Sequence, residues 1–554
     1  MNYAGRYLLA LMVFMLLLAA CQDEGTEATE VPEPTVAAEE TPIEEASPEA
    51  LQETEATEPT VAPTAEPAEE TASAGTLPRV EPLDECFVEM PEGAGYECLR
   101  VEVPEFHNEE NGRSIKLGVI RLLSTADTPA EPLFFAEGGP GGSNVDIAAE
   151  IAINMLDGDE SVYTDLLSTR DLVFFTQRGT SYAEPALMCS EESTNPYLEV
   201  FFSSSSPQER AGAETEAYKA CLEEFTEAGI DFAAYNSVES AADINSIREL
   251  LGYDQIVLYG DSYGTLLAQH VMRDYPDTLT TVILDGIVPL SSPTWDSQLD
   301  ARYQSALAYL IGLCAADEAC SEAYPNLSAD IEAVYQKLQA EPNLVDQGGR
   351  QLNVDENLAA WAFHDAMLSP LFAPYLPLAV DSLLNDKLDD QMMIIFIPII
   401  PNFKDISFPM HFAVVCSEAP VTSVDDAISL DEVSSVVSEY VQSDTYRYIE
   451  ICSHLNLPVL SEEMKAPIST DIPVLLLSGA FDSTTPPFNA EAIAGTLPNS
   501  FSFEFPYGGH VQFLSGDACA ESIVTSFIAD PTTEPDSRCI AEALPLQFAL
   551  PAEQ

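Results

Sequence analysis

A serine between two glycines is the first feature of this chain that points to chemistry. The stretch Gly260-Asp-Ser-Tyr-Gly264 follows an apolar run at 255–259 and precedes an amphipathic run at 265–275. A strand-to-helix turn of this kind holds a strained backbone that exposes the serine hydroxyl, and the helix N-terminus faces a developing oxyanion. The pattern predicts that Ser262 is a nucleophile, with Asp261 shaping the turn.

A serine nucleophile needs a general base and an acidic group that orients the base. Of the six histidines, only His510 follows all of the predicted strands, in the loop after the last one, so it is the predicted base. Asp482 follows the predicted strand 474–478 and is the predicted acid. Asp285, at the end of the strand that follows the nucleophile helix, is the alternative acid.

The oxyanion of an acyl-transfer reaction needs two backbone N–H donors. Tyr263 supplies one donor at the elbow. The glycine-rich loop at 137–143, after the predicted strand 132–136, lets backbone approach a substrate closely, and Gly139 is the candidate for the second donor. A phosphate-binding loop is the competing interpretation, but the loop lacks the Gly-Lys-Ser/Thr ending of that motif.

Short β-rich runs that alternate with helical stretches surround these residues and predict an α/β sheet covered on both faces. Eight strands are expected in one mostly parallel sheet, at 98–103, 114–122, 132–136, 171–177, 255–260, 281–285, 474–478 and 501–505. Between Pro289 and Ile472 helical patterns replace this rhythm, at 299–314, 328–341, 356–367 and 433–448. We therefore expect a helical lid at 291–471, inserted between core parts at 78–290 and 472–554, with a separate second domain as the alternative.

The N-terminus predicts export. Arg6 precedes an apolar stretch, Leu8 to Ala20, which is too short to span a bilayer as a mature helix and is typical of a signal peptide at 1–20. Cys21 ends a stretch that resembles the bacterial lipobox, which predicts lipidation at this cysteine; ordinary cleavage and an uncleaved anchor are the alternatives. Residues 21–77 are rich in Glu, Thr, Pro and Ala, and predict a disordered acidic tether.

The chain is strongly acidic, with 93 acidic residues against 20 basic residues and a net charge of −73. This balance disfavours binding to nucleic acid or to an anionic lipid surface through a basic patch. It favours cationic ligands such as free peptide N-termini, although it is equally consistent with an adaptation for solubility or salt.

Ten cysteines remain when Cys21 is set aside, and an exported chain meets an oxidising environment in which thiols pair. We expect sequential disulfides, which would join residues 86 and 98, 189 and 221, 314 and 320, 416 and 452, and 519 and 539. No C-x-x-C motif is present and the histidines do not cluster with cysteines, so no metal site is indicated.

Several motifs together resemble the tripeptidyl-aminopeptidase-like and prolyl-iminopeptidase-like serine peptidases of the α/β-hydrolase fold. They are Gly138-Gly-Pro-Gly-Gly142, Gln177-Arg-Gly-Thr180, the elbow at 260–264, Leu284-Asp-Gly286, Val415-Cys-Ser-Glu418, the Asp482 segment and Gly509-His510. The resemblance covers about residues 86–540, with 472–554 as the TAP-like C-terminal region. It implies the same triad and oxyanion loop, and a lid that closes over the N-terminal end of a substrate.

Two residues depart from the family pattern. Glu137 stands where related enzymes often have His or a small polar residue, and Thr176 replaces the usual Asp before Gln-Arg-Gly. These departures leave the substrate open, because the loop lines the acyl pocket and family members include esterases. An exopeptidase needs a carboxylate for the free α-ammonium group, and Glu418 is the candidate, with a solvated acid beside a disulfide as the alternative.

The sequence therefore predicts an exported, lipid-anchored serine hydrolase, which removes short peptides or single residues from free peptide N-termini and needs no cofactor. Its expected partners are such peptides and, through Cys21, the outer face of a bacterial cell membrane; nucleic acid is not expected. A carboxylesterase with the same triad is one alternative. A ligand-binding lipoprotein on a catalytically silent hydrolase scaffold is another.

Overall fold

The computed structural model describes residues 77–108, 112–158, 161–347, 350–387, 395–396 and 403–551. The described residues all belong to one compact unit. The predicted signal peptide, the predicted lipidation site Cys21 and the predicted tether up to residue 76 lie outside the described residues. Within the described part of the chain, no helix is both long enough and apolar enough to cross a membrane.

A mostly parallel sheet organises the unit, as the sequence predicted. In the described residues it has nine strands in the order β1-β2-β3-β5-β4-β6-β7-β10-β11. Parallel pairing runs from β5 through β4, β6, β7 and β10 to β11, and β1, β2 and β3 add antiparallel strands at one edge. The strands are β1 (Arg79–Pro82), β2 (Tyr96–Pro104), β3 (Ser114–Leu122), β4 (Ala130–Ala136), β5 (Arg170–Phe175), β6 (Ile256–Asp261), β7 (Leu279–Asp285), β10 (Val474–Gly479) and β11 (Ser500–Phe505).

The expected number of eight strands is one too few, because β1 was not predicted. It has only four residues, which is too short for an alternating pattern to show, and it ends in proline. Its place at the sheet edge, where Arg79 pairs with Glu102 of β2, tolerates that proline.

Alternating side chains of the strands divide the core into two layers. Leu133, Phe135, Tyr259 and Ile283 pack with α2 (Val145–Asp157), α3 (Val162–Leu167) and α16 (Ala518–Ala529) on one face. The residues between them on the strands pack on the other face with α6 (Ser237–Leu250), α7 (Tyr263–Asp274) and α15 (Pro487–Ala494). Helices on both faces explain why the central strands are apolar throughout.

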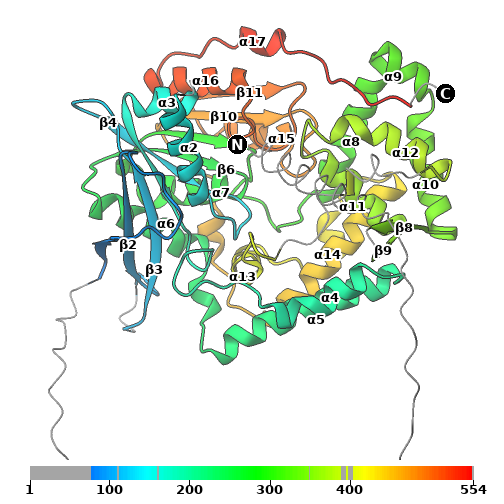
Figure 1. Ribbon diagram of the computed structural model, residues 1–554, viewed down its shortest axis with the longest axis horizontal. Coiled ribbons are helices and arrows are strands. Elements are labelled where there is room, and N and C mark those ends of the chain that lie inside the picture. The colour runs from blue at the N-terminus through cyan, green and yellow to red at the C-terminus, as the bar shows by residue number, and fades with distance from the viewer. Residues whose placement is uncertain are drawn as a thin grey trace, which may run out of the picture. The chain divides into compact units, whose positions relative to one another are not determined.

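A long segment lies between two strands that are neighbours in the sheet. Strand β7 pairs with β10 through Val282 and Val474, so residues 286–473 leave the sheet and return to it. Their helices lie to one side of the sheet (Figure 1). They are α8 (Leu299–Ala316), α9 (Glu318–Ala323), α10 (Leu327–Ala340), α11 (Glu356–Ala366), α12 (Leu376–Leu384), α13 (Phe408–Glu418) and α14 (Ser435–Leu455), with a hairpin of β8 (Asn343–Gln347) and β9 (Arg350–Val354) that was not predicted.

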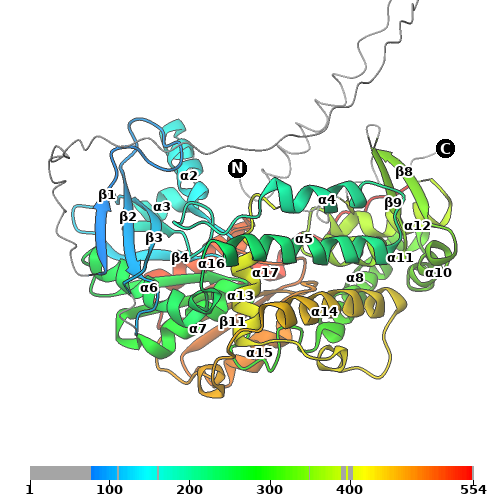
Figure 2. The same ribbon diagram turned by 90° about the horizontal axis from the view of Figure 1, so that it is seen from below.

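Two helices from the first core part join this helical body. Helices α4 (Glu191–Phe201) and α5 (Pro207–Glu227) pack on each other, and α5 packs along α14 (Figure 2). Helix α5 begins with a capping box, in which Ser206 accepts from the Glu209 N–H and the Glu209 carboxylate accepts from the Ser206 N–H. The helical body is therefore larger than the segment 291–471 expected from the sequence.

Within the described residues, five disulfides join neighbouring cysteines of the sequence, which confirms the sequential pairing. One of them, between Cys416 and Cys452, ties α13 to α14 within the helical body. The others join Cys86 to Cys98, Cys189 to Cys221, Cys314 to Cys320 and Cys519 to Cys539.

Candidate active site

Ser262 lies in a strained turn between strand β6 and helix α7. Its φ of 51° and ψ of −123° are rare for a residue with a side chain. The turn is possible because the two glycines around it have no Cβ: a Cβ on Gly260 would lie 2.3 Å from the carbonyl oxygen of Gly264, and one on Gly264 would lie 2.0 Å from that of Ala136. The strand and helix therefore cross closely enough to lift Ser262 out of the turn.

Asp482 and His510 meet at the ends of two adjacent strands. Asp482 follows β10 and is fully buried, and its Oδ2 lies 2.8 Å from Nδ1 of His510. The loop after Asp482 completes the arrangement, because the N–H groups of Thr484 and Thr485 each donate to Asp482 Oδ1 at 2.8 Å. The Thr485 hydroxyl donates to Asp482 Oδ2 at 2.5 Å and lies 2.9 Å from His510 Nδ1.

Ser262 and His510 both lie at the end of strand β7. The Ser262 N–H donates to the carbonyl oxygen of Asp285 at 2.9 Å. The next residue, Gly286, lies under the imidazole, since a Cβ there would be 3.4 Å from His510 Nδ1. Ser262 and His510 thus lie beside successive residues of one strand end, and both remain partly exposed.

The Asp482–His510 pair sets the ionisation of both side chains. Burial opposes protonation of His510, but the adjacent Asp482 charge and its hydrogen bond raise the pKa of His510 above its usual value. Burial also opposes ionisation of Asp482, yet His510 and the donors of Thr485 keep the pKa of Asp482 below its usual value. The arrangement suits a base that becomes positively charged when it accepts a proton.

The glycine-rich loop packs directly on the nucleophile. A Cβ on Gly138 would lie 2.8 Å from Ser262 Cβ, and the loop closes on itself where the Gly142 N–H donates to the Gly138 carbonyl oxygen at 3.3 Å. Tyr263 is the first residue of α7, so its N–H has no acceptor within the helix. Gly139, with a φ of 114°, lies at the tip of this turn.

Helix α13 holds the far side of the loop. The Ser407 N–H, at the start of this helix, donates to the Gly141 carbonyl oxygen at 3.0 Å. His411 is neutral, because burial lowers its pKa to about 4. Its Nδ1 lies 3.1 Å from the Pro140 carbonyl oxygen, which can only accept, so we assign the proton to Nδ1; Nε2 then accepts from the Tyr448 hydroxyl at 2.9 Å.

The sequence matches two family models. The α/β hydrolase fold model matches residues 131–323, which contain the glycine loop and the elbow, and the TAP-like protein model matches residues 438–539, which contain Asp482 and His510. The chain is a serine hydrolase of the α/β-hydrolase fold.

Relatives of this hydrolase include both peptidases and an esterase. "Serine protease Hip1" of Mycobacterium tuberculosis is 23% identical over 81% of this chain and 87% of its own length. "Carboxylesterase B" of the same species is 26% identical over 80% of this chain and 86% of its own length. "Tripeptidyl aminopeptidase" of Streptomyces lividans is 25% identical over 36% of this chain and 37% of its own length. A solved esterase from Thermogutta terrifontis, at 14% identity, covers 78% of this chain and 99% of its own with a TM-score of 0.33.

Asp285 of the hydrolase, the alternative acid, anchors the loop that carries His510. Its carboxylate accepts from the N–H groups of Gln512 and Phe513 and from the Tyr259 hydroxyl, at 2.7 to 3.0 Å. Burial nevertheless raises its pKa to about 6. The acid that hydrogen-bonds to the imidazole is Asp482.

Glu418 lies under the nucleophile helix. It is buried at the C-terminus of α13, where Oε1 accepts from the Ser237 N–H at 2.5 Å and Oε2 lies 3.8 Å from Nε2 of His270. The cavity beside it has a volume of only about 20 Å³. These contacts join Glu418 to α6 and to the third turn of α7, and not to the exposed side of Ser262.

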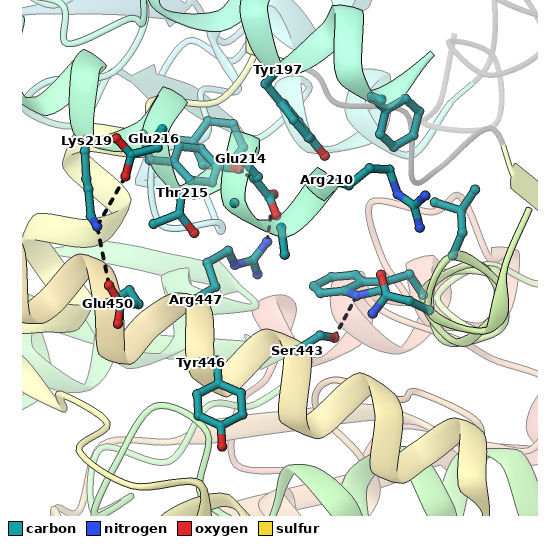
Figure 3. A pocket seen from close by; sticks show the side chains of 18 of the residues that line it. Tyr197, Arg210, Glu214, Thr215, Glu216, Lys219, Ser443, Tyr446, Arg447 and Glu450 are labelled. Atoms are coloured by element: carbon teal, nitrogen blue, oxygen red, sulfur yellow. Dashed lines mark hydrogen bonds and ion pairs between the residues drawn. The ribbon is translucent and has the colours of Figure 1, made fainter. Parts of the chain in front are cut away.

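A larger cavity, of about 750 Å³, opens between α5 and α14 (Figure 3). Tyr197, Tyr218, Trp361 and Phe408 give it apolar walls, and we call it the α5–α14 cavity. The figure shows two bridges across it: Lys219 of α5 reaches Glu450 of α14 at 3.4 Å, and Arg447 of α14 reaches Glu214 of α5 at 3.3 Å.

The inner end of the α5–α14 cavity approaches the catalytic loops. Asp365 lines it, and the neighbouring His364 carbonyl oxygen accepts from the hydroxyl of Ser483, which follows Asp482. Phe408 lines it beside Ser407, which holds the glycine loop. The cavity shares its walls with the segments that position the acid and the loop, although its lining does not include Ser262.

Metal binding finds no support in the described residues. They contain no group of three or more His, Cys, Asp or Glu side chains that could hold a metal ion. The reaction that Ser262 and His510 can perform also needs no metal, since a neutral imidazole accepts the serine proton directly. The absence of a cofactor stays a prediction.

Proposed function

We propose that this serine hydrolase is an exopeptidase that releases short peptides or single residues from free peptide N-termini. Ser262 Oγ attacks the scissile carbonyl carbon while His510 takes its proton, and Asp482 orients and stabilises the imidazolium. The N–H groups of Gly139 and Tyr263 hold the oxyanion. The proton then passes to the leaving amine, and water, activated by His510, hydrolyses the acyl-enzyme.

The observation that carries the exopeptidase proposal is a buried acidic site without enough cations. Asp296, in the segment before α8, and Asp444, on α14, are only 2% and 6% exposed. Together with Glu214 they place three carboxyl groups around two guanidinium groups, Arg302 and Arg447. Burial and the Asp444 charge raise the pKa of Asp296 to about 8, so one further cation would be stabilised here.

Asp296 has an unused hydrogen-bond acceptor for such a partner. Its Oδ2 is buried without a hydrogen bond to any described residue. The charge of Arg302 favours ionised Asp296, but its Nη2 points to the Trp295 carbonyl oxygen at 3.4 Å and its Nε is unpaired among the described residues. An α-ammonium group of a substrate supplies one positive charge and three donors.

The acidic site lies toward the catalytic loops. Arg302 is close enough to Asp482 for its pKa to respond to that charge. The Trp295 ring meets the ring of His411 edge-on at a centroid distance of 5.9 Å, and His411 contacts the glycine loop at Pro140. A free N-terminus held by Asp296 and Asp444 would therefore extend toward Ser262 from the helical body, which favours this pair over Glu418.

Three substrates test the proposal: a free-amino tripeptide anilide, its N-acetylated twin and a p-nitrophenyl ester, each with wild type and Ser262→Ala. We expect cleavage of the free-amino anilide, little cleavage of the acetylated one, and loss of activity in Ser262→Ala. Asp296→Asn should raise KM for the free-amino anilide by about tenfold or more without changing the ester reaction, since hydrogen bonds to charged groups contribute roughly 1.5–3 kcal/mol. Glu418→Gln is the matched comparison.

Other outcomes support the rival functions. Cleavage of the ester alone would make the protein a carboxylesterase, which one of its relatives is named. Activity on none of the substrates, with no labelling of Ser262 by a fluorophosphonate, would support a silent ligand-binding scaffold. An increase in KM for Glu418→Gln but not for Asp296→Asn would return the amine site to Glu418.

We also propose that the protein is exported and anchored through a lipid on Cys21. The apolar stretch 8–20, the lipobox-like residues before Cys21 and the five disulfides all support an extracytoplasmic location. Expression in a bacterial host should give a membrane-bound protein with a lipid mass shift. Cys21→Ser should remove the mass shift, and membrane binding with no mass shift would argue for an uncleaved anchor.

A further inference from the structure

Three carboxyl groups lie side by side beneath the nucleophile. Glu137 directly follows β4, Asp261 ends β6 and Asp285 ends β7, and these strands are neighbours. The register pairs Ala136 with Gly260 and Asp261 with Asp285, which puts the three acids in a row. The alternation of the strands points the row to the face of Tyr259, and the acids are 7%, 5% and 0% exposed.

The hydrogen bonds distinguish the members of this row. Asp285 is satisfied as an anion by two backbone N–H groups and the Tyr259 hydroxyl. Apart from its own N–H, Asp261 has one backbone donor, the Gly138 N–H at 3.2 Å from Oδ2, and its Oδ1 is buried with no hydrogen-bond partner among the described residues. A buried carboxylate with so few donors is costly, so Asp261 needs a proton or a cation.

We propose that Glu137 and Asp261 share one proton, and that this protonated pair holds the glycine loop at 138–142 against the nucleophile elbow. Glu137 begins the loop and Asp261 precedes Ser262, so a proton between them joins the two segments that frame the oxyanion. Asp261 also accepts from Gly138, the residue before the proposed donor Gly139. Glu137 and Asp261 are thus positioning residues, and the inference rests on the proposed roles of Ser262 and the glycine loop.

The surroundings of Asp261 favour the protonated form. Burial raises its pKa well above the usual value, and the Glu137 charge and then the Asp285 charge raise it further, against the weaker effects of the Gly138 N–H and of its own N–H. The other titratable groups that face it are Tyr163 of α3 and Tyr259 of β6, whose own pKa values are raised by burial. All of these neighbours are acids, so none of them supplies a positive charge.

The shared proton makes the loop sensitive to alkaline pH. When the pair loses its proton to solvent, two carboxylates at adjacent strand ends repel each other and push the glycine loop away from Ser262. The oxyanion then loses a donor, which lowers kcat by up to roughly 100-fold. KM for a small ester should change little, because the loop acts on the transition state.

The test is the pH dependence of ester hydrolysis for wild type, Glu137→Gln, Glu137→Ala and Glu504→Gln. Wild type should lose kcat on the alkaline side. Glu137→Gln keeps a hydrogen bond to Asp261 but leaves no second carboxylate to repel it, so the alkaline decline should be absent. Glu137→Ala should lower kcat at every pH, and Glu504→Gln, an acid on the edge strand β11, should leave the wild-type decline in place.

Infrared spectroscopy supplies a readout that is independent of activity. The protonated-carboxyl band of the wild-type protein at neutral pH, to which Asp296 and Glu418 also contribute, should lose the contribution of the shared proton in Glu137→Gln, because Asp261 then ionises more easily. The inference is overturned if this band is unchanged, or if Glu137→Gln and wild type share the same alkaline decline. Persistent ester hydrolysis in Ser262→Ala would instead refute the proposed catalytic mechanism, which separates the two failures.

Discussion

At the scale of residues, the proposed catalytic acid Asp482 depends on a threonine that no motif indicates. Thr485 gives Asp482 both its N–H and its hydroxyl, and the hydroxyl also contacts His510. A threonine three residues after an acid is unremarkable in a sequence. Its role becomes visible only when the loop folds back over the carboxylate.

The hydroxyl of Thr485 should therefore matter for kcat. Thr485→Val keeps the shape and the N–H donor but removes one hydrogen bond to a buried charged group, and we expect kcat to fall by about 10- to 100-fold. Thr485→Ser retains the hydroxyl and should stay close to wild type. Equal losses in both variants would mean that the γ-methyl group, and not the hydroxyl, is what the site requires.

The charge of Asp482 should appear in the pH profile. His510 must be neutral to act as the base, and its pKa is raised above 6.5, so kcat/KM should decline as the pH falls through this raised value. Asp482→Asn removes the attraction between the Asp482 carboxylate and the His510 imidazolium. The decline of kcat/KM at low pH should therefore move to lower pH, and kcat should fall by roughly 10⁴-fold. An acidic decline that stays in place in Asp482→Asn would show that another group titrates.

At the scale of elements, the crossing of β4, β6 and α7 fixes the elbow. A Cβ on Gly264 would collide with the backbone of Ala136, which cannot yield without moving β4 and the glycine loop. The strained φ of Ser262 is thus maintained by the packing of a helix on two strands. Local sequence indicates this turn correctly because the close approach demands glycine at both flanking positions.

Two glycine substitutions should separate packing from helix propensity. Gly264→Ala should abolish activity and lower the melting temperature, whereas Gly212→Ala on α5, where a Cβ meets nothing within 4 Å, should stabilise the protein by up to about 1 kcal/mol. Thermal unfolding and ester hydrolysis of both variants test this. A fully active Gly264→Ala would show that the helix can withdraw from β4.

At the scale of the whole molecule, several buried acids favour an acidic environment. Burial raises the pKa of Asp285 to about 6, of Glu418 to about 7 and of Asp296 to about 8. The net charge of −73 adds repulsion between carboxylates, which also grows as they ionise. Both effects make the folded state less stable as the pH rises.

Stability should therefore decrease as the pH rises from about 5 to about 8. An acid with a raised pKa holds its proton more tightly when folded than when unfolded, so its contribution is complete below the unfolded pKa and is lost as the pH passes the folded pKa. Calorimetry should show a higher melting temperature at the lower pH, and added salt should recover the part due to surface repulsion. A melting temperature that rises over this range would mean that the buried acids are ionised in the fold.

The sequence by itself determined the parts of this protein that depend on neighbouring residues. The eight strand positions, the glycine-flanked elbow and the pairing of adjacent cysteines all follow from local patterns of apolar residues, turns and spacing. Order along the chain was enough to predict that His510 and Asp482 lie together, because parallel strands bring their carboxyl ends to one edge.

Only the tertiary structure decided which distant residues share an environment. It joined α4 and α5 to the helical body, put Glu418 under α7, and collected Asp296 and Asp444 into one buried site. It also aligned Glu137 with Asp261 through the register of β4 and β6. None of these contacts has a local signal, since each depends on how strands align and helices pack after the chain has folded.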